Sequence, residues 1–288
     1  MKIPDNSLQS FVAFFRKEMV DVLPGSEINS HLSEIFSRLF SLSRADLLLN
    51  RSRAFSESEI LLFFNLVKKL KTGMPLAYAL GVKEFYGLDF AVNENVLIPR
   101  PETEELVDWI FKSDDITAED IKILDIGTGS GCIAIALKKY LPTSEVSALD
   151  VSEKALELAI KNAKTQEVAV SFLQMDFLRG KLSQQYDLIV SNPPYISEAE
   201  RGGMERNVLD HEPGIALFAA ADPLIFYKKM IESSNNLTDD GWFYWEINQY
   251  LWKELLDILH ENDFRNIEMR KDINDNPRMI RCQKPVPR

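Results

Sequence analysis

Residues 123–131, ILDIGTGSG, decide the fold of this chain. Three of the first four residues are apolar, which predicts a buried strand, and the glycines that follow predict a turn into a helix. Glycine lets the backbone adopt positive φ and approach a ligand closely. A bare turn rarely needs three glycines in five positions, so we predict a ligand-binding loop between this strand and the next helix.

The spacing of the glycines separates three kinds of ligand. A P-loop closes on Gly-Lys-Ser/Thr, whereas Cys132 follows Gly131 here, and a dinucleotide fingerprint needs glycine in the sixth position, which Cys132 occupies. The remaining pattern, D-x-G-x-G-x-G, is that of methyltransferases that use S-adenosylmethionine (AdoMet), whose loop faces a methionine carboxylate and a ribose. The residues of this candidate cofactor loop are Asp125, Gly127, Thr128, Gly129, Ser130 and Gly131.

Strands and helices alternate on both sides of the loop, which predicts an α/β fold with a doubly wound, Rossmann-like sheet. Two strands separated by a turn close the chain, which indicates one antiparallel member at the sheet edge. The predicted strands are residues 121–126, 146–150, 170–175, 186–191, 242–247, 264–269 and 278–282, and the predicted helices are residues 102–111, 132–140, 153–163, 223–233 and 251–259.

The first 95 residues are organised differently. Apolar residues recur at three- and four-residue steps within residues 8–19, 32–39 and 60–70, and Ser56 with Glu59 predicts a capping box at the start of the third segment. Gly87 separates two short alternating runs, which predicts a hairpin. We therefore expect a helical domain over residues 1–80, a β-hairpin linker over residues 81–95 and a methyltransferase domain over residues 96–288.

Acidic residues follow the next two predicted strands. Asp150 ends one of them, where a carboxylate can accept the hydroxyls of a ribose or, alternatively, cap the helix that begins near Ser152. Asp176 and Phe177 end the other, where they can serve an adenine, or can be no more than a polar strand end and a core ring. All of these positions lie at the edge of the sheet where such folds bind ligands.

A second motif, SNPPY at residues 191–195, follows the fourth predicted strand and falls at the same edge. Two consecutive prolines cannot extend a strand ladder, and a plain proline turn is one interpretation. The side-chain carbonyl of Asn192 beside a backbone carbonyl fixed by Pro193 and Pro194 would also form a pair of acceptors for an NH₂ group, on which Tyr195 could stack. The motif therefore predicts a planar amide or amino nitrogen as methyl acceptor.

Composition excludes several classes of protein. The chain has 288 residues and a formal net charge of −11, which argues against nucleic acid as the main partner. It has no apolar run long enough for a bilayer and no signal-peptide pattern, so we expect a cytoplasmic protein without membrane association. Its two cysteines and three histidines have no metal-ligand spacing, which predicts no metal site.

The chain resembles the release-factor glutamine methyltransferases, the PrmC/HemK family, over nearly all of its length. NPPY alone also occurs in DNA adenine methyltransferases, so the segments IPRPETE and EPGIALF point to this family. The matching segments are residues 73–78 (GMPLAY), 84–87 (EFYG), 96–104 (VLIPRPETE), 125–134, 191–196 and 212–218 (EPGIALF). The chain departs from the family pattern at residues 219–221 and at Asn248.

The resemblance implies N5-methylation of the glutamine in the Gly-Gly-Gln motif of peptide-chain release factors, with the helical domain gripping the release factor. By analogy, the cofactor loop, Asp150, Asp176, Phe177 and Asn192 would contact AdoMet. The acceptor glutamine would be held by Asn192, Pro193, Pro194 and Tyr195, with Asn192, Pro193 and Tyr195 in the catalytic role. An adenine-N6 methyltransferase of DNA or RNA is the alternative, and a non-catalytic interaction protein with this fold is a second one.

Overall fold

The computed structural model describes residues 3–113, 116, 120–219 and 221–285. The chain divides into two compact units. Unit 1 contains Met1–Gly81 together with Glu205–His211, and unit 2 contains Val82–Met204 and Glu212–Arg288. The hairpin expected as a linker is grouped with unit 2, and residues 205–211, expected in the methyltransferase domain, are grouped with unit 1.

Unit 1 is helical, with a core made largely of phenylalanine. Phe11, Phe36, Phe55 and Phe63 are fully buried or nearly so, and the Phe11 and Phe55 rings stack with their centroids 4.5 Å apart. Two of the helices, α3 and α5, are too short to show a periodic pattern in the sequence. The helices are α1 (Leu8–Met19), α2 (Gly25–Phe40), α3 (Arg44–Leu49), α4 (Glu57–Leu70), α5 (Leu76–Leu80) and α9 (Arg206–His211).

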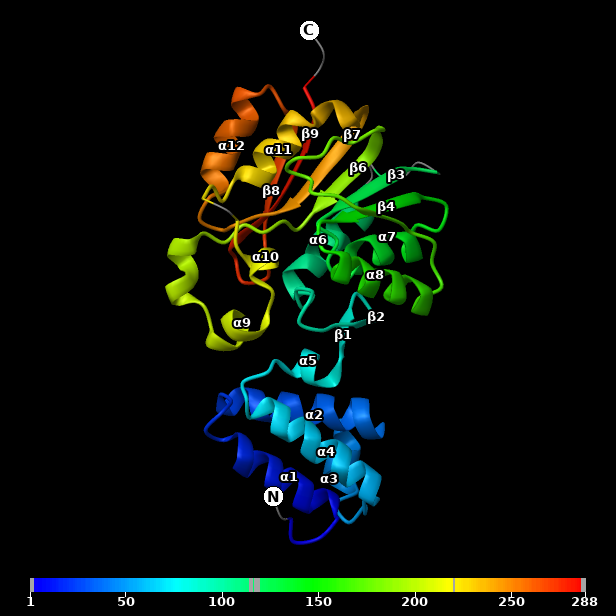
Figure 1. Ribbon diagram of the computed structural model, residues 1–288, viewed down its shortest axis with the longest axis vertical. Coiled ribbons are helices and arrows are strands. Elements are labelled where there is room, and N and C mark those ends of the chain that lie inside the picture. Colours follow the sequence, from blue (N-terminus) through cyan, green and yellow to red (C-terminus); the bar gives the residue numbers. More distant parts are fainter. Residues whose placement is uncertain (1–2, 114–115, 117–119, 220, 286–288) are drawn as a thin grey trace. The chain divides into compact units, whose positions relative to one another are not determined.

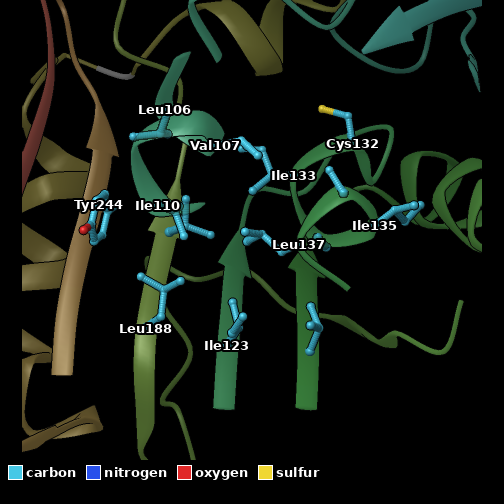
Figure 2. Close-up of a cluster of buried hydrophobic side chains, with 14 of the residues drawn as sticks. Leu106, Val107, Ile110, Ile123, Cys132, Ile133, Ile135, Leu137, Leu188 and Tyr244 are labelled. Atoms are coloured by element: carbon cyan, nitrogen blue, oxygen red, sulfur yellow. The ribbon is translucent and has the colours of Figure 1, made fainter. Parts of the chain in front are cut away.

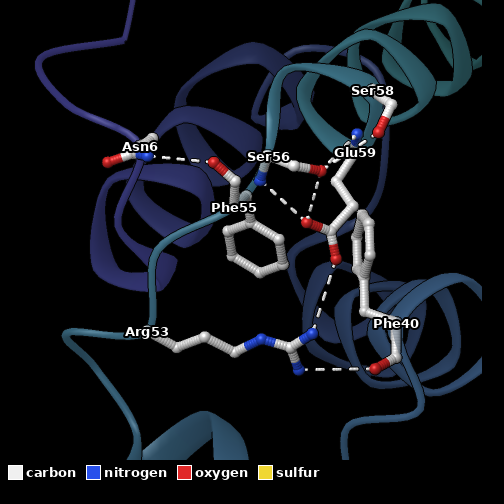
Figure 3. A network of polar contacts seen from close by, with 7 residues as sticks. All are labelled: Asn6, Phe40, Arg53, Phe55, Ser56, Ser58 and Glu59. Atoms are coloured by element: carbon white, nitrogen blue, oxygen red, sulfur yellow. Dashed lines mark hydrogen bonds and ion pairs between the residues drawn. The ribbon is translucent and has the colours of Figure 1, made fainter.

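The predicted capping box is present at the start of α4 (Figure 3). The Ser56 hydroxyl accepts a hydrogen bond from the Glu59 amide, and Glu59 Oε2 accepts one from the Ser56 amide at 2.8 Å. These bonds hold the pKa of Glu59 below its ordinary value. Arg53 lies 3.5 Å from Glu59 Oε1 and also donates to the Phe40 carbonyl, so the cap is tied to the end of α2.

Unit 2 is built on a seven-stranded sheet of order β5-β4-β3-β6-β7-β9-β8 (Figure 1). The five strands from β5 to β7 are parallel. The strand order reverses direction at β3, because β3 lies between β4 and β6. The strands are β3 (Lys122–Ile126), β4 (Glu145–Asp150), β5 (Ser171–Gln174), β6 (Tyr186–Ser191), β7 (Leu237–Glu246), β8 (Arg265–Lys271) and β9 (Pro277–Gln283).

The position of the antiparallel strand differs from the prediction. The sequence indicated an antiparallel member at the sheet edge, but β9 pairs antiparallel with both β7 and β8 and is internal. The edge strand β8 therefore runs in the same direction as the parallel strands. A strand order of this kind depends on pairing between distant segments, which local sequence patterns do not report.

Helices cover both faces of the sheet. On one face, α6, α7 and α8 bury side chains such as Ile110 and Leu137 against Ile123 and Leu188 (Figure 2). On the other face, α11 and α12 pack Met230 and Leu259 against the strands. The helices of unit 2 are α6 (Pro101–Phe111), α7 (Cys132–Tyr140), α8 (Glu153–Thr165), α10 (Gly214–Leu217), α11 (Ile225–Glu232) and α12 (Trp252–Glu261), with 3₁₀ turns at Glu198–Gly203 and Ser234–Asn236.

The predicted hairpin forms from β1 (Val82–Phe85) and β2 (Leu88–Ala91). Tyr86 and Gly87 both have positive φ, which is the backbone of a type I′ turn, and they connect strands paired in antiparallel register. Asn162 of α8 accepts a hydrogen bond from the Ala91 amide and donates one to the Ala91 carbonyl. The hairpin is thus fixed to helix α8. Among the described helices of the whole chain, none combines the length and apolarity needed to cross a bilayer.

Candidate active site

The cofactor loop and the SNPPY motif meet at the carboxyl ends of β3 and β6. Ile126 and Ser191 are register partners at the ends of these parallel strands, and the Ser191 hydroxyl donates to the Ile126 carbonyl at 2.7 Å. The strand order reverses at this point, and open α/β sheets bind their ligands at such a reversal. The two motifs that the sequence placed at one edge are therefore neighbours in space.

The cofactor loop is held by the next strand. The Leu149 carbonyl accepts hydrogen bonds from the amides of Gly127 and Thr128, at 2.9 and 3.0 Å. Gly129 donates its amide to Asp150 Oδ2 at 2.9 Å. These bonds shape the loop before any ligand arrives, which reduces the conformational entropy that binding must remove.

The glycines of the loop serve two different purposes. A Cβ atom at Gly127 or Gly129 would meet nothing within 4 Å, so their surface is open for a ligand to approach the backbone. A Cβ atom at Gly131 would lie 2.8 Å from Ile135 Cδ1 and 3.1 Å from Ala159 Cβ, and the φ of Gly131 is +83°. Gly131, whose predicted contact with the cofactor remains a prediction, therefore packs the start of α7 against α8.

The replacement Gly131→Ala is expected to destabilise unit 2. The added methyl group would contact Ile135 and Ala159 and would force a left-handed backbone on alanine, so we expect a loss of about 2–4 kcal/mol in the free energy of unfolding. Chemical denaturation measures this loss. Gly202→Ala is the matched control, since a Cβ atom there meets nothing within 4 Å and its φ is not positive. Equal stability of the two variants would contradict the packing role.

Asp150 lies at the carboxyl end of β4, and its helix-capping alternative is not observed. Ser152 is itself the N-cap of α8 and accepts the Ala155 amide. The two carboxylate oxygens of Asp150 instead accept the amides of Gly129 and Ser152, each at 2.9 Å. Each oxygen keeps a free lone pair for a ligand hydroxyl. Burial raises the pKa of Asp150, and the amide hydrogen bonds oppose this rise.

Asp125 lies inside unit 2, beneath the loop. It is fully buried, and its Oδ2 accepts the Thr128 hydroxyl at 2.6 Å. Its Oδ1 has no hydrogen-bond partner among the described residues, although the neighbouring Ala134 amide acts to lower the pKa. Desolvation dominates and raises the pKa of Asp125 to about 7. Asp125 supports the loop by holding Thr128, and its predicted contact with the cofactor remains a prediction.

The buried carboxyl of Asp125 makes stability depend on pH. Its pKa rises from 3.8 in the unfolded chain to about 7 in the folded one, so the folded state holds the proton more tightly. The associated stability is complete below pH 3.8 and is lost as the pH rises through about 7. We expect the difference in unfolding free energy between the wild type and Asp125→Asn to fall by up to about 4 kcal/mol across that window. Denaturation at several pH values measures it, and a flat difference would contradict the assignment.

Asp176 and Phe177 follow β5 in a turn and both line the cavity described below. Asp176 accepts the Leu178 amide at 3.0 Å and lies 3.5 Å from the Arg179 guanidinium. Phe177 is 4% exposed and belongs to the core on the α11 face. Its ring thus serves as core and as cavity wall at once, so the two interpretations of the sequence are not exclusive.

Asn192 is connected to two residues from distant parts of the chain. Its Nδ2 donates to Thr103 Oγ1 at 3.0 Å, and the Thr103 hydroxyl donates to Glu246 Oε2 at 2.6 Å. The Tyr195 hydroxyl donates to Glu246 Oε1 at 2.8 Å. No described residue donates a hydrogen bond to Asn192 Oδ1 or to the Pro193 carbonyl. Asn192, which lines the cavity described below, therefore has Oδ1 available to a ligand, whereas Pro193 is buried and does not line that cavity.

One cavity of unit 2 joins these features. Its empty volume, including the part open to solvent, is about 980 Å³. Of the predicted site residues, Asp125, Gly131, Pro193 and Tyr195 are not among those that line it. The lining includes the predicted residues Gly127, Thr128, Gly129, Ser130, Asp150, Asp176, Phe177, Asn192 and Pro194.

Two further polar residues of the cavity wall, Arg100 and Thr103, were not assigned a site role from the sequence. Arg100 donates to buried Glu212 Oε1 at 2.6 Å and is the one cationic side chain of the cavity among the described residues. Both belong to the segment IPRPETE, which marked the family but carried no chemical pattern of its own. Glu246 was also missed, although a lone carboxylate ending the apolar run WFYW is a usable signal.

Cys132 and Asn248 can now be placed. Cys132 is a buried free thiol at the start of α7, and burial raises its pKa to about 12, so it is a packed thiol rather than a nucleophile. Asn248, a departure from the family pattern, donates to the Tyr195 carbonyl at 3.1 Å and to Glu200. It therefore holds the loop after the NPPY segment. Ala220, in the other departure, lies outside the described residues.

Comparison with known proteins agrees with this architecture. Residues 109–210 match the family model of the methyltransferase small domain, and residues 30–81 match that of the PrmC N-terminal domain. A release factor glutamine methyltransferase of Flavobacterium psychrophilum is 43% identical over 279 residues, which cover 95% of this chain and 98% of that relative. The chain belongs to the release factor glutamine methyltransferase family.

Other members of the release factor glutamine methyltransferase family are also similar along their whole length. The one from Bacteroides thetaiotaomicron is 37% identical over 277 residues, covering 95% of this chain and 99% of its own. A solved methyltransferase from Pyrococcus furiosus has a TM-score of 0.52 at 17% identity, over 81% of this chain and all of that one. That likeness supports the methyltransferase fold.

Proposed function

We propose that this protein methylates the side-chain N5 of the glutamine in the Gly-Gly-Gln motif of peptide-chain release factors, using AdoMet. One observation carries the proposal: no residue that the structure describes donates a hydrogen bond to Asn192 Oδ1 or to the Pro193 carbonyl, and both follow the strand beside the cofactor loop. Two acceptors so placed suit the two hydrogens of a primary amide. The curated relatives support release factors as the protein substrate.

The residues of the cavity suit AdoMet in chemistry. The open surface at Gly127 and Gly129 admits a ligand against the backbone, and Asp150 has free lone pairs for ribose hydroxyls. The wall at Phe177 offers an apolar surface for an adenine, and Arg100 is a cation for a carboxylate. AdoMet, when bound, supplies a methyl group made electrophilic by the sulfonium.

The protein's own contribution is alignment. An amide nitrogen is a weak nucleophile because its lone pair is delocalised into the carbonyl. Hydrogen bonds from the substrate NH₂ to Asn192 Oδ1 and the Pro193 carbonyl would orient the nitrogen and favour the positive charge that develops on it during transfer. Holding reacting atoms about 3–3.5 Å apart supplies several kcal/mol through proximity. The proton can leave after the methyl group has been transferred, so no strong general base is needed.

The proposal extends to unit 1, which we assign to gripping the release factor, as its match to the PrmC N-terminal domain supports. Because release factors act with the ribosome, we propose a cytoplasmic site of action. The adenine-N6 alternative shares the NPPY motif, but the net charge of −11 does not favour it.

Methyl transfer from labelled AdoMet tests the proposal. The protein is incubated with a release factor, with the same factor carrying Gln→Ala in its Gly-Gly-Gln motif, and with duplex DNA or RNA. We expect label on the native factor alone. Label on nucleic acid would support the adenine alternative, and no label with any acceptor would support the non-catalytic one.

A further inference from the structure

Glu246 is a carboxylate in a place where a carboxylate is costly. It ends β7 and is 1% exposed, between Trp245 and Ile247, which are also buried. Burying an ionised group requires compensating partners, and replacing it with an apolar residue is often no less stable. A function of its hydrogen-bond partners would therefore explain why a carboxylate is buried here.

The partners of Glu246 lead to the NPPY segment by two routes. Oε2 accepts the Thr103 hydroxyl, which in turn accepts Asn192 Nδ2, and Oε1 accepts the Tyr195 hydroxyl. The backbone carbonyl of Glu246 accepts a hydrogen bond from the Tyr227 hydroxyl at 2.8 Å, which fixes the backbone at the end of β7. Asn192 and Tyr195 are thus both anchored to one buried carboxylate.

The polarity of this chain of hydrogen bonds follows from donor counting. An ionised carboxylate only accepts, so the single proton of the Thr103 hydroxyl must point to Glu246, 2.6 Å away. The hydroxyl can then only accept from Asn192, which turns the NH₂ of Asn192 toward Thr103. The carbonyl oxygen of Asn192 is consequently left for the ligand.

We infer that Glu246 and Thr103 are positioning residues that fix which end of the Asn192 amide faces the acceptor. The inference rests on the proposed function, because a donor in place of the Asn192 carbonyl would face the NH₂ group of the substrate and repel it. Glu246 sets the direction of the Thr103 hydroxyl, and that hydroxyl sets the orientation of the Asn192 amide.

The direction of these hydrogen bonds depends on whether Glu246 is protonated, and charged groups near Glu246 affect its protonation. Arg278 of β9 approaches from the neighbouring strand and is paired with Asp272 at 3.0 Å, while Glu102 of α6 adds a like charge. Burial raises the pKa of Glu246, and the bonds from Thr103 and Tyr195 and the charge of Arg278 oppose the rise. A protonated Glu246 would donate a hydrogen bond to the Thr103 hydroxyl, which would then donate to Asn192 and reverse the direction of these hydrogen bonds. Methyl-transfer activity should therefore decline as the pH falls through the pKa of Glu246.

Paired substitutions at Thr103 test the inference. We expect Thr103→Val, which keeps the shape and loses the hydroxyl, to lower kcat about 10- to 100-fold, with KM for the release factor and Kd for AdoMet changed less than about threefold. Thr103→Ser keeps the hydroxyl and should retain kcat within about threefold. Thr238→Val is the matched control, since its hydroxyl donates to Asp187 at 3.0 Å at the opposite end of the sheet.

A spectroscopic measurement reports on the hydrogen bond between the Asn192 amide and Thr103. In the protein labelled with ¹⁵N-asparagine, we expect the Asn192 side-chain amide signal to be preserved in Thr103→Ser and Thr238→Val and shifted in Thr103→Val and Glu246→Gln. Glu246→Gln is the second variant if Thr103→Val folds poorly. An unshifted amide signal in Thr103→Val, or equal losses of kcat in the valine and serine variants, would overturn the inference. If the wild type labels no release factor, the proposed function fails, and the amide signal still decides the role of Thr103.

Discussion

Asn192→Ala is expected to abolish nearly all methyl transfer while leaving the cofactor in place. The side chain supplies the acceptor Oδ1, and among the described residues its hydrogen-bond partner is Thr103. Its removal takes away one of two groups that orient the acceptor nitrogen, so we expect kcat to fall about 10²- to 10³-fold. Single-turnover assays with a release factor measure the transfer step, and calorimetry measures AdoMet binding.

The control for this variant is Asn236→Ala. The Asn236 side chain donates to the Gln184 carbonyl at 2.8 Å, at the other end of the sheet, so its loss should leave kcat unchanged within about twofold. Turnover of Asn192→Ala close to that of the wild type, with normal AdoMet affinity, would refute the role assigned to Asn192. A large loss of AdoMet affinity instead would move Asn192 from the acceptor to the cofactor.

Asp150→Ala is expected to weaken AdoMet binding about 10- to 100-fold. The carboxylate has lone pairs free for ribose hydroxyls, and hydrogen bonds to a charged group contribute about 1.5–3 kcal/mol. It also holds the Gly129 amide at 2.9 Å, so the loop loses part of its preformed shape. Calorimetric titration with AdoMet measures the change in Kd.

Asp187→Ala provides the comparison for Asp150. Asp187 also accepts a backbone amide, that of Lys122 at 2.8 Å, and a hydroxyl, that of Thr238, but at the amino ends of β3, β6 and β7. The two variants should lose similar stability, and only Asp150→Ala should lose AdoMet affinity. Equal affinities in both variants would exclude the ribose contact.

Several features of both units could be predicted because their signals are local. The turn at the glycine loop and the hairpin at Gly87 in unit 2, and the capping box at Ser56 in unit 1, each depend on a few adjacent residues, and the structure confirms all three. The site depends instead on long-range contacts. Thr103 and Glu246 are 143 residues apart, and no pattern in either segment predicts the hydrogen bond between their side chains.

The direction of a side chain is a second limit of the sequence. Asp125 and Tyr195 lie in the predicted motifs, yet one is buried beneath the loop and the other points to Glu246. The burial of Asp125 follows from the alternation of side chains along a twisted strand, and the direction of Tyr195 follows from the turn at the prolines. Each of these depends on the assembled sheet. A motif thus identified the chemistry, and only the fold separated the residues that line the cavity from those that support them.

The internal position of β9 has a consequence for synthesis. The chain makes β8 before β9, yet among the described strands β8 pairs with β9 alone. Until Pro277–Gln283 emerges from the ribosome, β7 therefore presents an open edge and β8 remains unattached. Such an edge invites pairing with other chains, so the nascent protein passes through a stage prone to aggregation. A chain that lacks β9 would keep this open edge of β7 and an unattached β8.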